Sequence, residues 1–260
     1  MTDTHAHLFL DDFSTDLPEV IARAKSAGIT KILMPNIDSS TLEALHKTEK
    51  EYDGYCLAMS GLHPTSVESD YVRQLNLIES SFRVRTYCAI GEIGIDLYWD
   101  KTRLKEQIIA FEAQLNWAKE WDLPVVIHVR ESFPHVLESI YKVGPDRLRG
   151  VFHSFGGSIE DAEEIMKLNT FKMGINGVVT FKNSSLSNTL LSVPLSYIVL
   201  ETDAPYLTPV PYRGKRNESV YMIYTAQKLA EIYQLPVNKI AEITTQNANL
   251  LFSLPQICPC

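Results

Sequence analysis

The sequence lacks the features that mark membrane-spanning and secreted proteins. No apolar run approaches the roughly 20 residues needed to cross a bilayer, and no basic-then-apolar leader precedes a small-residue cleavage site. No internal repeat, low-complexity tract or linker divides the 260 residues. We therefore expect a single domain over residues 1–260, a cytoplasmic location and no membrane partner. The oligomeric state stays open.

Cysteine is scarce. Cys56 and Cys88 lie in apolar, strand-like segments, where a free cysteine behaves as a small hydrophobic residue. Cys258 and Cys260 form a terminal CPC, which we interpret as an exposed tail with incidental thiols, although a redox or metal role stays open. Four cysteines in an intracellular protein of this size do not predict a disulfide framework.

Positive charge is in deficit. The chain has 24 Lys and Arg against 32 Asp and Glu, which gives a net charge of −8. A long phosphate backbone attracts proteins of the opposite sign. Any nucleic acid must therefore be bound through a local basic patch or through metal ions, not through the overall field of the protein.

Apolar segments with the character of strands alternate with helical patterns along most of the chain. Strands are predicted at 1–6, 29–36, 55–62, 86–94, 123–129, 148–155, 170–177 and 195–203, and helices at 40–52, 70–82, 103–121, 132–142, 158–168, 217–233 and 236–251. Repeated βα units of this length indicate a parallel sheet. About eight units predict an α/β fold, a (β/α)8 TIM barrel, with active residues at the carboxyl ends of its strands.

Side chains that can ligate a metal lie at the ends of five of the predicted strands. They are His5 and His7, Glu92 and Asp96, His128, His153, and Glu201 and Asp203. Alternate residues of a strand point to the same side, so His5 and His7 can reach one cation together. Buried acids and imidazoles need partners, and a divalent cation satisfies several of them at once. The sequence therefore predicts a metal site at the barrel mouth, with the ligands His5, His7, Glu92, His128, His153 and Asp203.

Several polar residues have more than one interpretation. A carboxylate after a strand often caps the next helix, and Asp96 is open to that role. His63, in SGLHP, contacts a substrate, ligates a metal or stabilises the turn before Pro64. His46 and His135 lie on predicted helical faces, where we expect them to be solvated.

At these residues the sequence resembles the TatD family of metal-dependent deoxyribonucleases, within the amidohydrolase-type barrels. The matching segments run along essentially the full chain and are DTHAHL, SGLHP, GEIGID, LPVVIHVRES, GVFHSFGGS and ETDAPYLTPVPYRGKRNE. The last segment is long and specific, whereas a bare H-x-H would be weak evidence. Only Met1 and Thr2 precede DTHAH, so we expect the barrel end opposite the site to be less well covered.

The resemblance implies a centre with one or two divalent metal ions. One ion would be held by His5, His7 and Asp203, the other by His128 and His153, and Glu92 would bridge them. No lysine ends the fourth strand, so a carbamylated-lysine bridge is not expected. Mixed nitrogen and oxygen ligands suit Zn²⁺, Mn²⁺, Co²⁺ or Fe²⁺, although the family is described as Mg²⁺-dependent.

The expected reaction is hydrolysis of DNA by a metal-activated water. A bound divalent ion lowers the pKa of water toward about 7, and we expect Asp203 to orient that water and accept its proton. A protein that takes only a strand end needs few phosphate contacts. The negative net charge therefore favours an exonuclease, which we expect to work from 3′ to 5′ on single strands.

Substrate contacts are expected from His63 and from cationic residues near the strand ends. The loop PYRGKRN places Arg213, Lys215 and Arg216 after the eighth strand. Arg130 lies on the same side of its strand as His128, and its guanidinium suits phosphate geometry. Tyr98 and Trp99, after the fourth strand, either stack on a nucleobase or pack between helices.

Two other functions are considered for the same ligand set. An amidohydrolase-like enzyme for a small amide, lactone or phosphoester would use the same metal centre. Replacing Arg213 and Lys215 distinguishes it, because DNA cleavage should suffer while hydrolysis of a neutral small substrate should not. A non-enzymatic metal-binding or scaffold protein is disfavoured by the complete ligand set.

Overall fold

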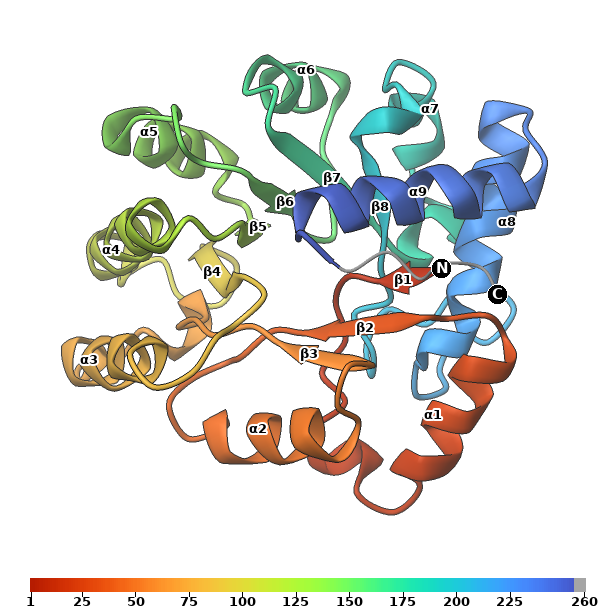
Figure 1. The fold of residues 1–260 in the computed structure, drawn as a ribbon. Helices are drawn as coiled ribbons and strands as arrows, with labels where there is room; N and C mark the ends of the chain where they lie inside the picture. Colours follow the sequence, from red (N-terminus) through yellow and green to blue (C-terminus); the bar gives the residue numbers. More distant parts are fainter. Residues whose placement is uncertain (255–260) are drawn as a thin grey trace.

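The computed structural model describes residues 1–254, in which eight parallel strands alternate with helices (Figure 1). The strands are β1 (Thr2–Asp3), β2 (Lys31–Met34), β3 (Cys56–Ala58), β4 (Ile90–Asp96), β5 (Val125–Arg130), β6 (Gly150–Phe152), β7 (Phe171–Ile175) and β8 (Ile198–Leu200). The α-helices are α1 (Leu17–Ser26), α2 (Leu42–Glu51), α3 (Tyr71–Phe82), α4 (Leu104–Trp121), α5 (Phe133–Val143), α6 (Ile159–Lys167), α7 (Leu186–Leu190), α8 (Met222–Tyr233) and α9 (Val237–Leu251). Cys258 and Cys260 lie outside the described residues.

Short 3₁₀ helices complete the elements. They are η1 (Asp11–Phe13), η2 (Pro64–Ser66), η3 (Gly177–Thr180), η4 (Leu195–Tyr197) and η5 (Ser219–Tyr221). None of the helices within residues 1–254 combines the length and the apolar character that crossing a membrane requires.

The strands form two parallel arcs, β1-β2-β3 and β4-β5-β6-β7-β8, that meet at both ends. At one seam, Ser60 N–H donates to Ala89 O (3.3 Å) and Gly91 N–H donates to Ser60 O (3.1 Å). At the other seam, Thr4 N–H donates to Leu200 O (3.1 Å). The seams complete a ring of strands, with helices arranged around it in Figure 1, and the predicted TIM barrel is confirmed.

The element boundaries differ from the sequence prediction in instructive places. The helix predicted over 217–233 begins only at Met222, because Asn217 is occupied elsewhere: its side-chain amide donates to Thr202 O (2.8 Å) and Tyr206 O (2.6 Å). The prediction also omitted α1 and α7, and α7, at five residues, is too short to show a helical period.

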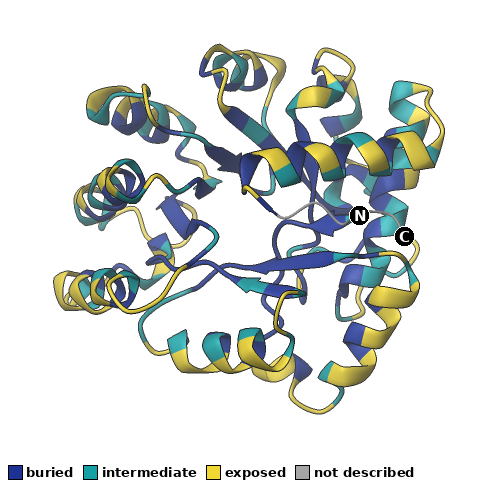
Figure 2. Cartoon of the chain, viewed as in Figure 1, coloured by how far each residue is buried: buried dark blue, intermediate teal, exposed yellow. Residues whose placement is uncertain are grey.

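The outer helices bury the side that faces the strands and expose the opposite side (Figure 2). A second apolar cluster lies inside the barrel. Its members are Leu33, Met59, Ala89, Val126, Val151 and Val199 from six strand regions, together with Ala248, Leu251, Phe252 and Leu254 from α9 and the segment after it. The expectation of a poorly covered barrel end is therefore wrong, because α9 and its following residues pack against that end, as its position across the strands in Figure 1 also shows.

Candidate metal centre

Histidines and carboxylates from distant parts of the chain meet where the strands end. One group consists of His5 and His7, after β1, and Asp203, after β8. His5 Nε2 lies 3.3 Å from His7 Nε2 and 3.6 Å from Asp203 Oδ1, and His7 Nε2 lies 3.5 Å from the same oxygen. Three ligand atoms thus surround one small space.

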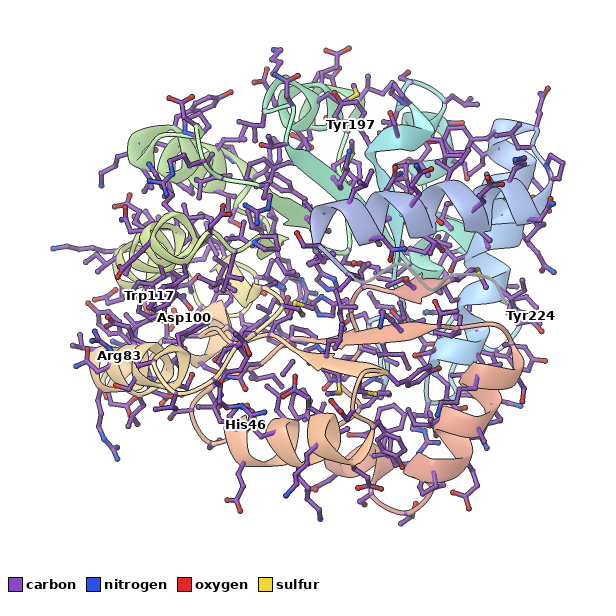
Figure 3. All side chains as sticks on the ribbon, in the orientation of Figure 1. His46, Arg83, Asp100, Trp117, Tyr197 and Tyr224 are labelled. Carbon is purple, nitrogen blue, oxygen red and sulfur yellow. The ribbon has the colours of Figure 1, made fainter. Side chains whose placement is uncertain are left out.

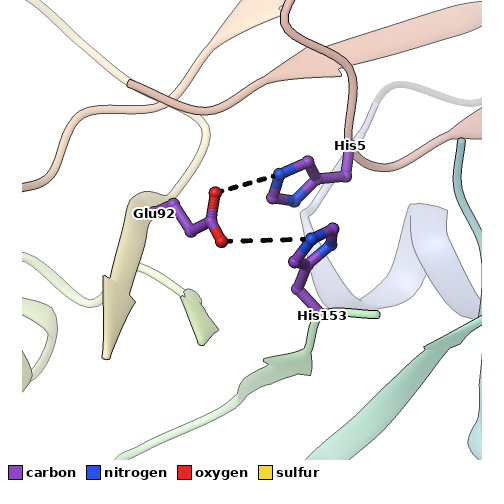
Figure 4. Close-up of side chains that lie close together, drawn as sticks. All are labelled: His5, Glu92 and His153. Carbon is purple, nitrogen blue, oxygen red and sulfur yellow. Dashed lines mark ion pairs between the residues drawn. The ribbon is translucent and has the colours of Figure 1, made fainter. Parts of the chain in front are cut away.

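Glu92 joins this group to His153, which follows β6. Figure 4 shows the Glu92 carboxylate facing both imidazoles, with one oxygen toward each. Glu92 Oε2 lies 3.2 Å from His5 Nε2, and Oε1 lies 3.9 Å from His153 Nε2. The His5 and His153 rings stack with their centroids 3.4 Å apart. A second group of possible ligands, His5, Glu92 and His153, therefore overlaps the first.

A third group contains His63, Glu92 and His128. His128 Nδ1 lies 2.9 Å from Glu92 Oε1, and His63 Nε2 lies 3.5 Å from the same oxygen. His63 also has a structural contact, because its Nδ1 accepts from Thr65 N–H (3.2 Å) at the start of η2. Two of the three interpretations left open for His63 therefore have a geometric basis: it stabilises the turn, and it faces the other possible metal ligands.

The donor set fits a divalent cation. Ligand atoms about 2.1 Å from a tetrahedral cation lie roughly 3.4 Å from one another, and the separations among His5, His7 and Asp203 are 3.3–3.6 Å. The atoms of each of the three groups lie within 4.8 Å of one another. Mixed nitrogen and oxygen donors are compatible with several transition metals, so the geometry does not identify the ion.

Two further carboxylates contact the outer sides of the histidines. Asp96 Oδ2 lies 2.8 Å from His128 Nε2, and Glu201 Oε1 lies 2.9 Å from His153 Nδ1. Each contact leaves the other ring nitrogen facing Glu92. Such outer contacts orient a ligating imidazole and select its tautomer. The sequence placed both acids at strand ends but assigned neither of them this role.

Asp96 also stabilises the loop that follows β4. Its Oδ1 accepts from Tyr98 N–H (2.9 Å) and Trp99 N–H (3.3 Å), within the loop after β4. The residue before α4 is Arg103, so the alternative that Asp96 caps the following helix is wrong. Asp96 instead connects the aromatic loop to His128.

Asp3 is a buried acid that sequence reasoning overlooked. Its oxygens accept from the hydroxyls of Thr202 (2.7 Å) and Ser219 (2.7 Å), and from Thr202 N–H (3.0 Å). These bonds connect β1 to the segment that carries Asp203. Burial outweighs the hydrogen bonds and raises the pKa of Asp3 to about 6. The alternation Asp3, His5, His7 is the pattern that signals its inward direction.

Charges within the cluster oppose the effect of burial. Burial lowers the pKa of His128, but Asp96 and Glu92 outweigh it and raise that pKa to about 9. Burial likewise lowers the pKa of His153, but Glu201, Glu92 and Asp203 raise it to about 10.

The pKa values of the two carboxylates are lowered, whereas those of His128 and His153 are raised. Burial raises the pKa of Glu92, yet His63, His5 and His153 hold it well below its usual value. Burial raises the pKa of Asp203, and His153 and His7 outweigh it. The carboxylates are thus ionised at neutral pH, and without metal they are compensated by protons on imidazoles.

The predicted cationic contacts differ in how they are held. Within residues 1–254, the side chains of Arg130, Arg213 and Lys215 have no carboxylate partner at ion-pair distance; the guanidinium of Arg213 lies 3.7 Å from the Phe181 ring centroid. Arg216 is different, because its guanidinium binds both oxygens of Asp16 (2.7 Å each) and also Glu218 (3.1 Å). Its inclusion in the cationic cluster is therefore wrong.

The two remaining histidines lie away from the centre. His46, labelled on α2 in Figure 3, has its Nε2 2.8 Å from the Tyr87 hydroxyl, so it is partly buried and not simply solvated as expected. His135 is on α5 and is also partly buried. Neither belongs to any of the three ligand groups.

Comparison with known proteins places these residues in context. The family model described as "TatD related DNase" matches residues 2–253. The chain is 38% identical, over 97% of its length and 98% of the relative's, to "Uncharacterized metal-dependent hydrolase YabD" of Bacillus subtilis. It is 31% identical to "3'-5' ssDNA/RNA exonuclease TatD" of Yersinia pseudotuberculosis, over 98% and 100% of the two chains. The solved structure of YjjV, a TatD homologue from Escherichia coli, superposes with a TM-score of 0.91 at 29% identity and covers 98% of both chains.

Proposed function

The chain belongs to the TatD-related DNase family of metal-dependent hydrolases, and we propose that it is a 3′–5′ exonuclease that acts on single-stranded DNA. The observation that carries the proposal is that Glu92 belongs to two of the ligand groups, and that His5 connects one of these to the group that contains His7 and Asp203. The polarity and the preference for single strands are supported by the name of the 31% identical Yersinia relative.

We assign the ligands to two sets. His5, His7 and Asp203 would hold one divalent ion, and His128 and His153, which both face Glu92 Oε1, would hold the other. Glu92 would contribute to both sets, which its position between His5 and His153 supports (Figure 4). Asp96 and Glu201 hold the outer nitrogens of His128 and His153, so that the inner nitrogens face the shared space.

When bound, divalent ions lower the pKa of water and offset the charge of the phosphodiester. Asp203 orients the attacking water and accepts its proton. Its carboxylate is available for this role because its lowered pKa keeps it ionised at neutral pH, and water reaches it because 14% of its side chain is exposed. His63, Arg130, Arg213 and Lys215 contact the substrate, the cationic three through its phosphates.

The test uses metal-reconstituted protein and single-stranded or duplex DNA labelled at either the 5′ or the 3′ end. We expect a ladder of 5′-labelled products that shortens from the 3′ end, and slower digestion of the duplex. Asp203→Asn should be less active by about 10²–10⁴-fold, the usual contribution of a positioned general base. Equal cleavage by the two proteins would identify a contaminating nuclease, and internal cuts would contradict exonuclease action.

The enzyme is proposed to act as a single domain in the cytoplasm. Both statements stay predictions from the sequence. Fractionation of cells that express the tagged chain tests the location, and limited proteolysis tests the domain organisation.

A further inference from the structure

We propose that Tyr98, Trp99 and Arg130 form a nucleotide subsite beside the metal centre, in which one base of a single strand stacks on Trp99 while its phosphate contacts Arg130. The inference rests on the proposed exonuclease function and specifies where the substrate lies. It concerns the loop between β4 and α4, whose aromatic residues the sequence left undecided between stacking and packing.

Trp99 differs from the other tryptophans of the chain. Trp121 stacks on Phe82 with the ring centroids 4.5 Å apart, and Trp117 is 8% exposed in the same aromatic group. Trp99 is 71% exposed and Tyr98 is 50% exposed. Packing between helices is therefore not their role. A large aromatic surface turned to solvent beside a catalytic mouth is typical of a surface that binds a ligand.

The aromatic loop is held in place by the same acid that contacts the metal centre. Asp96 Oδ1 accepts from both Tyr98 N–H and Trp99 N–H, while its Oδ2 contacts His128. Gln107 of α4 bonds to both backbone polar groups of Asp96, accepting at 2.8 Å and donating at 3.1 Å. The loop therefore has a defined position relative to Glu92 and His128, as a subsite requires.

Arg130 supplies the anion-binding part of the subsite. Its guanidinium carbon lies 3.7 Å from the Tyr98 ring centroid and 5.6 Å from that of Trp99. The adjacent Glu131 pairs with Lys101 (3.1 Å), and within residues 1–254 no carboxylate lies at ion-pair distance from Arg130. A guanidinium that is oriented by an aromatic ring and lacks an acidic partner is well suited to bind phosphate.

A cavity of about 440 Å³ lies between this loop and the segment after β3. Glu68 and Arg103 line it together with Asp96, Trp99 and Asp100, and Asp100 is labelled in the sector between α3 and α4 in Figure 3. Three carboxylates against one guanidinium disfavour a phosphate inside the cavity. They favour a nucleobase, whose ring and exocyclic N–H groups donate hydrogen bonds. The charge pattern thus directs the base inward and the phosphate toward Arg130.

The first experiment compares Trp99→Ala with the wild type on single-stranded substrates that carry one abasic residue, placed in turn at each position near the 3′ end. On intact DNA we expect Trp99→Ala to raise KM about 5- to 100-fold, the range that base–aromatic stacking supplies. At one abasic position the KM of the wild type should rise by the same factor. The KM of Trp99→Ala should not rise further on that substrate. Trp99→Phe should retain most of the affinity.

Two matched variants serve as controls. Tyr141 on α5 is 49% exposed, so Tyr141→Ala removes a comparable exposed aromatic ring outside the subsite. Arg83, after α3 and labelled in Figure 3, is an exposed arginine whose replacement by Ala controls for Arg130→Ala. Both controls should cleave like the wild type, whereas Arg130→Ala should raise KM and reduce its salt dependence.

A second readout does not depend on turnover. Acrylamide quenching of the metal-loaded protein should report an accessible tryptophan that disappears in Trp99→Phe. A hydrolysis-resistant phosphorothioate oligodeoxyadenylate should shield that tryptophan, and an abasic oligomer of equal length should not. If the wild type digests DNA while Trp99→Ala matches it on every substrate, the subsite is wrong and the nuclease assignment stands. If the wild type digests no nucleic acid, the proposed function itself fails.

Discussion

The interior of the barrel has two levels, and the same strands build both. Val126 lies two residues before His128 and Val151 two residues before His153, so each pair points to the same side of its strand. The valines belong to the apolar cluster beneath α9, whereas the histidines reach Glu92. A step of two residues therefore separates the part of the strand that stabilises the fold from the part that performs chemistry.

The two levels differ in what holds them together. The lower level is closed by Leu251 and Phe252, whose burial is favourable without any partner ion. The upper level gathers histidines and carboxylates whose burial is costly unless each charge is compensated. We infer that substitutions in the lower level affect stability with little effect on metal binding, and that substitutions in the upper level do the reverse.

The largest expected effect lies in the lower level. Phe252 is 4% exposed in the cluster that closes the barrel, so Phe252→Ala should lower the free energy of unfolding by about 3–5 kcal/mol. Leu250 is 69% exposed at the end of α9 and provides the matched control, since Leu250→Ala should change stability by less than about 0.5 kcal/mol. Chemical denaturation measures both values. If folded Phe252→Ala bound metal more weakly than the wild type, the two levels would not be independent, contrary to our inference.

In the upper level, Glu201→Gln should weaken the affinity for the second metal ion by about 10–100-fold, as expected for loss of an outer carboxylate on a ligating histidine. Titration calorimetry measures it, with Glu231→Gln, at an exposed residue of α8, as the control. Gly174→Ala, in β7, tests the same contact, because the added Cβ would overlap the Glu201 carboxylate and displace it. Unchanged metal affinity in both Glu201→Gln and Gly174→Ala would contradict the positioning role.

The dependence of stability on pH should also distinguish the levels. In the absence of metal, the pKa values of His128 and His153 are raised to about 9 and about 10, above the ordinary value near 6.5. The folded state therefore binds these protons more tightly, and the stability that they contribute is lost as the pH rises from about 6.5 to about 10.

The melting temperature of chelator-treated protein should accordingly fall by a few degrees over this range. Metal-loaded protein should not show this fall, because metal ligation requires neutral imidazoles and binding releases the protons. Calorimetry in buffers of different ionisation enthalpy should detect proton release at neutral pH. Parallel pH profiles with and without metal would argue against this account of the upper level.

The smallest effect is expected at the rim, beyond both levels. The double variant Arg213→Ala/Lys215→Ala should raise KM for single-stranded DNA several-fold and reduce the salt slope by about 1.4, or about 0.7 for each phosphate contact. Hydrolysis of a neutral small ester, if detectable, should be unchanged. Equal impairment on both substrates would show that the loop supports the metal centre and does not contact phosphate.

The sequence predicted much of this architecture because the polar residues at the ends of strands can be recognised in the sequence. His5 and His7, followed far along the chain by Asp203, lie at the ends of predicted strands, and parallel strands of a barrel deliver such residues to one end. Boundaries were less predictable. The stretch predicted as the strand 195–203 has ladder pairing only over Ile198–Leu200, because residues 195–197 form the 3₁₀ helix η4 and Thr202 N–H donates to the Asp3 carboxylate.

Other features depend on contacts between segments that are far apart. In the sequence, Arg216 looks like a third free cation beside Arg213 and Lys215. In the structure its guanidinium is paired with Asp16, which lies on the other side of the barrel seam. His63 comes close to Glu92 only because the segment after β3 pairs with β4 at Ser60. Neither pairing leaves a local pattern in the chain.

The sequence by itself determined which strand positions are apolar and which are titratable, since alternation of side chains along an extended backbone is a local property. Only the tertiary structure decided that Glu92 serves two ligand groups, that Asp96 and Glu201 turn their histidines inward, and that α9 closes the opposite end. The reason is physical: closure of the barrel determines which distant side chains come within a few ångströms of one another, and those separations govern both charge compensation and the capacity to hold a cation.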